Sequence, residues 1–157
     1  MAASIKRDRA LHILSHDHHR GLILAQLIKK DAPDYKDLPK TNSDKVEYTI
    51  SFYKNELVRH FKNEEGILYP AVKNKSKEID ELFEEIISEH KKIKLLVVQL
   101  ESGENKSDIL NELGVLLETH IRKEERNLFM KIQAILTKEE LTSVEKQLIQ
   151  SRDRMRR

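Results

Sequence analysis

The sequence predicts an all-α protein, and three observations support this. Only four glycines and three prolines occur in 157 residues, so few positions require a helix to end. Apolar residues recur in steps of three and four over long stretches, which places them on one face of a helix. Hydrophobic residues make up 38% of the chain and charged residues 36%, enough for a core with a charged surface. We therefore expect a single domain, residues 1–157, built from long amphipathic helices.

The breaks in the pattern divide the chain into four long helices and a short one. The first break, residues 31–44, contains two prolines, and weaker breaks follow at 74–76 and at Gly103. Pro70 should kink or end the second helix near Tyr69. The segment TKEE, starting at Thr137, has the form of a capping box and should open the last helix. The expected helices span residues 5–30, 44–73, 77–102, 107–135 and about 138–153.

Composition excludes several classes of function. The absence of cysteine rules out disulfides, thiolate metal sites and cysteine nucleophiles. A net charge of +2 gives no reason to expect a nucleic acid partner. No apolar run approaches the length of a membrane span, and the first residues lack a secretory signal. We therefore expect a cytoplasmic protein without a membrane partner.

Each long helix carries a histidine at a position of its apolar seam. The third seam, from Ile79 to Leu100, contains His90, and the first seam contains His12 and His16. One isolated histidine on such a seam is more often a hydrogen-bonded core residue than a ligand. The histidines expected at the seams as metal ligands are His16, His60, His90 and His120.

An internal repeat strengthens the interpretation of these histidines as ligands. The segment LVRHFKNEEGILY at 57–69 aligns with LETHIRKEERNLF, which begins 60 residues later. Each copy has a glutamate four residues after its histidine, Glu64 after His60 and Glu124 after His120, so each pair shares a helix face. Burying these groups without partners would cost several kcal/mol per charge. Two divalent ions of iron, manganese or zinc, bridged by the carboxylates, would remove that cost.

The motifs SHDHHRGL (15–22), HFKNEEGILYP (60–70), SEH (88–90) and HIRKEERNLF (120–129) resemble the hemerythrin-like, or HHE cation-binding, family over about residues 11–130. The resemblance implies an up-down-up-down four-helix bundle, here with a short C-terminal fifth helix. It implies two iron ions joined by an oxo or hydroxo bridge, with manganese or zinc as alternatives. Four terminal ligands and two bridging ones carry over: His16, His60, His90, His120, Glu64 and Glu124.

The resemblance also implies a function. Members of the family bind or sense oxygen or nitric oxide, or handle iron, so a small diatomic ligand is the expected partner. Oxygen carriers have a further histidine one turn after the third-helix ligand, and this chain has Lys94 there. His12 is a candidate for an extra or supporting ligand, and Tyr53 for a hydrogen bond to the bound ligand. His18, His19, Glu65 and Glu125 are expected at the surface or outside the ligand set.

Two alternative functions stay open at this point. A di-iron oxidoreductase of the ferritin type would use Glu-x-x-His, but no glutamate stands three residues before a histidine. A metal-free helical interaction module would tolerate leucine in place of the seam histidines. The sequence alone does not decide whether the protein is an enzyme.

Overall fold

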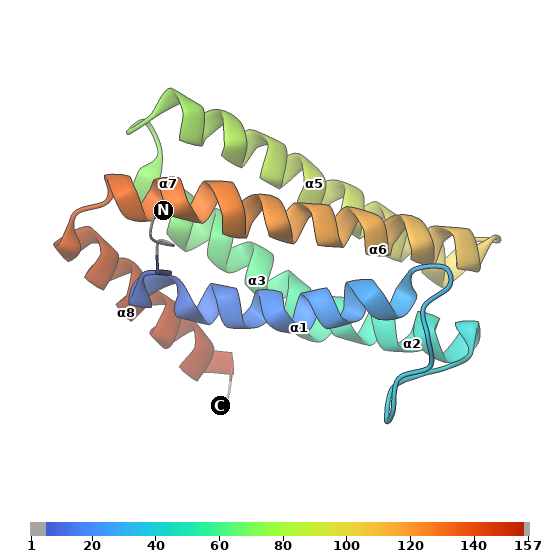
Figure 1. Ribbon diagram of the computed structural model, residues 1–157. Coiled ribbons are helices and arrows are strands. Elements are labelled where there is room, and N and C mark those ends of the chain that lie inside the picture. Colours follow the sequence, from blue (N-terminus) through green and yellow to red (C-terminus); the bar gives the residue numbers. More distant parts are fainter. Residues whose placement is uncertain (1–5, 156–157) are drawn as a thin grey trace, which may run out of the picture.

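The computed structural model describes residues 6–155, and every regular element in that range is helical. Consecutive long helices run in opposite directions along the bundle, and the last helix packs across one end (Figure 1). This confirms the predicted all-α bundle. The first, third and fifth helices are α1 (His12–Ile28), α5 (Lys77–Ser102) and α8 (Lys138–Met155). The second comprises α2 (Asn42–Phe52), η2 (Tyr53–Leu57), α3 (Val58–Asn63), η3 (Glu64–Leu68) and α4 (Tyr69–Val72), and the fourth comprises α6 (Lys106–Lys123), η4 (Glu124–Leu128) and α7 (Phe129–Ile135).

Side-chain caps determine where the helices begin. The Thr137 hydroxyl accepts a hydrogen bond from the Glu140 amide at 3.1 Å, and the Glu140 carboxylate accepts one from the Thr137 amide at 3.0 Å. This is the expected capping box, and it opens α8. The first helix begins later than predicted, because Asp8 caps a short 3₁₀ turn at Arg9–Leu11. Ile5, the expected first residue of that helix, lies outside the described residues.

Three π-helical turns interrupt the second and fourth helices. Two of them, η3 and η4, begin at Glu64 and at Glu124, the two glutamates of the internal repeat. Pro70 is the second residue after η3, and the helix does not end near Tyr69 but continues to Val72, close to the expected end at residue 73. Single π-helical turns within α-helices frequently occur at functional sites, because the extra residue redirects the neighbouring side chains.

The buried face of α1 differs from the predicted one. The apolar seam was expected to run through His12 and His16, but both of these side chains are exposed. The face that packs into the bundle instead carries His18, Gly21 and Ala25. A Cβ atom at Gly114 on α6 would lie 2.8 Å from the Ala25 carbonyl oxygen, so these two helices approach closely. Small residues permit this approach but contribute little hydrophobic signal in the middle of the face, between the buried Leu14 and Leu24, and sequence periodicity selected another face.

The apolar core forms two clusters, one toward each end of the bundle. One contains Leu14, Phe83 and Phe129 and is covered by α8. The other contains Leu24, Phe61 and Leu117. The buried polar residues described next come from the middle turns of the same helices. None of the helices in residues 6–155 combines the length and the apolar content that a bilayer crossing needs.

Candidate metal centre

Six buried polar side chains converge in the middle of the bundle. Glu64 and Glu124 are both 0% exposed, which is unusual for a charged residue. The four imidazoles around them are at most 5% exposed. Each of the four long helices contributes at least one of these groups: His18 from α1, His60 and Glu64 from the second helix, His90 from α5, and His120 and Glu124 from the fourth.

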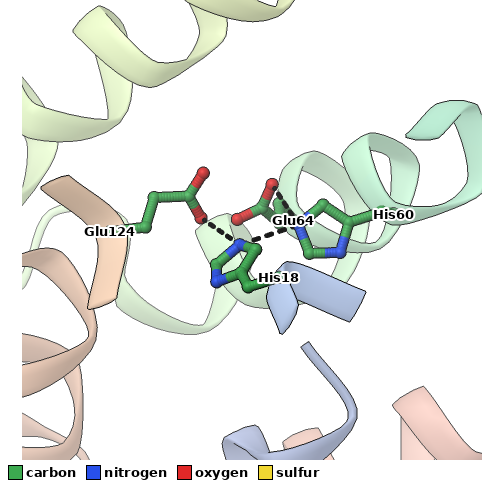
Figure 2. Close-up of side chains that lie close together, drawn as sticks. All are labelled: His18, His60, Glu64 and Glu124. Atoms are coloured by element: carbon green, nitrogen blue, oxygen red, sulfur yellow. Dashed lines mark hydrogen bonds and ion pairs between the residues drawn. The ribbon is translucent and has the colours of Figure 1, made fainter. Parts of the chain in front are cut away.

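The donor atoms form two groups of four that share both carboxylates. In the first group the Nε2 atoms of His60 and His18 lie 3.1 Å apart, and the Nε2 of His60 is 3.1 Å from an oxygen of Glu64. Figure 2 shows these side chains pointing toward one another, with His18 between Glu124 and His60. In the second group the Nε2 of His90 lies 3.3 Å from Glu64 and that of His120 lies 2.6 Å from Glu124. Within each group all four donor atoms lie within 4.8 Å of one another.

The arrangement fits metal ions better than it fits a hydrogen-bonded core. All four carboxylate oxygens of Glu64 and Glu124 are buried without a well-oriented hydrogen bond among the described residues, as are the Nε2 atoms of His90 and His120. Buried carboxylates left in this state are strongly destabilising. Nitrogen and carboxylate donors within a few ångströms of each other are ligands for iron, manganese or zinc. Since both carboxylates belong to both groups, the two candidate metal sites share Glu64 and Glu124.

A second layer of acids holds the histidines in place. Each imidazole donates its Nδ1–H to a carboxylate outside the cluster, which leaves Nε2 free to face inward. His60 donates to Asp17 at 3.0 Å, and His120 donates to Glu89 at 2.7 Å. The other two pairs are His90 with Glu65 at 2.8 Å and His18 with Glu125 at 2.6 Å.

This layer follows the internal repeat of the chain. Asp17 and Glu89 directly precede His18 and His90, and each bonds the histidine of the following helix. Glu65 and Glu125 directly follow the two shared carboxylates, and each bonds a histidine of another helix. The first two bonds lie within one half of the chain each, and the last two join the halves.

Burial and neighbouring charges shift the pKa values of the cluster. Burial disfavours the charged form and lowers the pKa of His18 and of His120. Burial opposes the charge on His60 too, but the carboxylates of Glu64 and Asp17 outweigh it and raise the pKa of His60 to about 9. Burial likewise opposes ionisation of Glu64, yet the imidazoles of His60 and His90 hold the pKa of its carboxyl well below the usual range. In the metal-free centre Glu64 is thus anionic and a proton on His60 takes the place of a cation.

The structure brings together five of the six residues expected from the sequence. The exception is His16, which is exposed, and His18 occupies the inward position in its place. His12 is also exposed, with its Nε2 3.2 Å from the Arg7 carbonyl oxygen, so it lies away from the cluster. Tyr53 is half-buried and lines a surface cleft next to His90.

Sequence reasoning missed His18 and the outer acids for identifiable reasons. His18 was expected near the surface because the α1 seam was placed on the wrong face. Glu65 and Glu125 were expected to face solvent; Glu65 is exposed and Glu125 is partly buried, but each also bonds a histidine of the cluster. The sequence did contain a pattern that indicates these residues: Asp17–His18 matches Glu89–His90. In each pair the histidine faces the cluster, and the acid bonds the histidine of the following helix.

The comparisons agree with this geometry. The family model described as hemerythrin HHE cation binding domain matches residues 9–132, which include all six residues of the cluster and all four outer acids. No match was found among curated proteins or among solved structures. The match covers most of the chain, and the chain belongs to the hemerythrin HHE cation-binding domain family.

Proposed function

We propose that the protein holds two iron ions through His18, His60, Glu64, His90, His120 and Glu124, and that it binds or senses oxygen or nitric oxide there. The observation that carries the proposal is that two four-donor groups share Glu64 and Glu124. Iron is favoured over zinc because the family resemblance points to iron. When bound, iron supplies redox chemistry and affinity for diatomic ligands.

The residues of the chain prepare the centre for this role. The outer acids accept the Nδ1–H of each imidazole, which fixes the tautomer and makes Nε2 a stronger donor. The two apolar clusters on either side exclude bulk water from the carboxylates. The carboxylates and imidazoles are therefore held ready for cations before any metal arrives.

A surface cleft of about 430 Å³ provides a route to the centre for a small ligand. Tyr53, Phe61 and Lys94 line it, and it reaches the ring of His90, which stacks on Phe61 with centroids 3.8 Å apart. Lys94 stands where the oxygen carriers of the family have another histidine, and its side chain is exposed. An ammonium group is not a metal ligand, so this side of the centre keeps room for a small molecule.

Anaerobic loading with ferrous iron tests the proposal. We expect two ferrous ions per chain and, on exposure to air, an absorption change that does not reverse under vacuum. Irreversible oxidation is expected because the open side leaves the iron less protected than in a carrier. Absence of iron uptake would contradict the proposal, and oxygen uptake that reverses under vacuum would make the protein a carrier.

Two alanine variants of α1 test the assignment of its ligand. His18→Ala is expected to lose about one of two ions, since His18 belongs to only one of the two donor groups. His16→Ala, two residues away on the same helix, should retain both, because that side chain is exposed. Metal content of the purified variants measures the difference. Loss of metal in the His16 variant, with retention in the His18 variant, would restore the assignment from sequence.

A further inference from the structure

A larger cleft of about 820 Å³ lies outside the metal cluster. Residues of α1, of the second helix and of α8 line it, so three elements distant in the sequence form its walls. Its volume is within the range of pockets that bind small molecules. The side chains in it are mostly polar, which distinguishes it from an uncovered apolar groove.

Nitrogen donors outnumber acids in this cleft. His12, His16 and Arg20 stand one turn apart along the exposed face of α1, and all three line the cleft. Arg59 and Arg152 join them from α3 and from α8. A stripe of two imidazoles and a guanidinium, faced by two more guanidiniums, is suited to an anion and unfavourable for a metal cation.

Two carboxylates in the cleft balance part of this charge. Glu56 accepts a hydrogen bond from Arg20 at 2.5 Å and from Arg59 at 3.3 Å. Asp17 accepts one from Arg20 at 3.2 Å, while its other oxygen holds His60. Arg152 contacts neither carboxylate, and its ion pair in the described chain is with the adjacent, exposed Asp153 at 3.5 Å. The lining carboxylates thus pair with Arg20 and Arg59, while the acid that pairs with Arg152 lies outside the lining.

The guanidiniums of Arg20 and Arg152 are both partly exposed. Arg20 bonds Glu56 and Asp17, whereas the ion pair of Arg152 uses its Nε atom and an acid outside the lining. An anion with several oxygens, placed between the two guanidiniums, would supply acceptors for their terminal N–H groups.

We propose that this cleft binds a small anionic molecule that carries a phosphate group. A phosphate has enough oxygens to accept from guanidiniums on different walls at once, and arginine forks match its geometry. Arg152 belongs to α8, which lies beyond the matched residues 9–132, so the complete cleft is a feature of this chain and not of the family match. The cleft also touches the metal centre through Asp17, whose carboxylate joins Arg20 to His60.

Titration calorimetry of the metal-loaded, full-length protein with phenyl phosphate tests the proposal, with inorganic phosphate as a second probe. Arg152→Gln is expected to weaken binding at least about tenfold, because it removes a charge-assisted contact. Arg154→Gln is the matched control, since Arg154 lies on the same helix and is exposed outside the cleft. It should change the affinity by less than about twofold.

The two variants also distinguish phosphate binding in the cleft from direct coordination of phosphate to the metal. Neither arginine contacts the six residues of the cluster, so a loss confined to Arg152→Gln locates binding in the cleft. Circular dichroism and metal content verify that this variant remains folded. No measurable heat with the unaltered protein, or equal affinities for the two variants, would overturn the proposal.

Discussion

Replacing both Glu64 and Glu124 by glutamine is expected to abolish binding of both metal ions. Each donor group contains both carboxylates, so the double change removes two of four ligands from each. Glutamine has nearly the same volume and leaves no cavity, which confines the effect to charge and ligand strength. Metal analysis after loading should fall from about two ions per chain to background. Glu112→Gln, an exposed carboxylate on α6, should leave the metal content unchanged.

The same variant separates a ligand role from a structural one. Without metal, the unaltered chain keeps two buried carboxylates that lack well-oriented hydrogen bonds. Neutral amides at both positions avoid that desolvation cost but also lose the pairing of Glu64 with protonated His60. Because the two effects oppose each other, the double variant should unfold within a few degrees of the metal-free parent. Full metal retention in the variant would contradict the assignment of both glutamates as ligands.

Removing the metal from the unaltered protein is expected to lower its melting temperature by roughly 10 °C. Metal that binds only the folded state at a concentration about a thousandfold above its dissociation constant contributes about 4 kcal/mol. For a domain of this size each kcal/mol shifts the melting temperature by about 2–4 °C. Differential scanning calorimetry before and after chelation measures the shift. Equal melting temperatures would contradict a metal-dependent fold.

The metal-free protein should also lose stability between pH 6.5 and about 9. The pKa of His60 rises from 6.5 in the unfolded chain to about 9 in the folded one, so the folded state binds an extra proton in that range. A raised pKa adds stability that is complete below pH 6.5 and disappears as pH rises through about 9. In the metal-loaded protein a cation replaces this proton, and the decline should be absent.

An aspartate variant checks the origin of that decline. Asp17→Asn removes one of the two carboxylates that raise the pKa of His60, so the metal-free variant should lose less stability over the same pH range. His18 and His120 act in the opposite direction. Their lowered pKa values reduce stability as pH falls below 6.5, since the unfolded chain then takes up the protons first. A metal-free protein whose stability rises steadily from pH 6.5 to 9 would contradict the raised pKa of His60.

Much of the centre could be predicted from sequence because its signal is local. The pairs His60–Glu64 and His120–Glu124 are four residues apart, and helix geometry alone puts each pair on one face. The third helix has a regular apolar seam of large residues, so the sequence also predicted that His90 faces inward. The bundle followed from the same periodicity, together with the scarcity of glycine and proline.

Only the tertiary structure decided which histidine of α1 faces inward. Three histidines lie within four residues there, and the buried face of the helix combines leucines such as Leu14 and Leu24 with Gly21, which packs closely against α6. The outer acids could not be assigned for a related reason. Glu65 and Glu125 bond histidines on other helices, 25 and 107 residues away in the chain. The spacing of residues along one helix determines which side chains share a face. The register between helices arises from packing, and that register placed His18 in the cluster and the four acids beside the imidazoles.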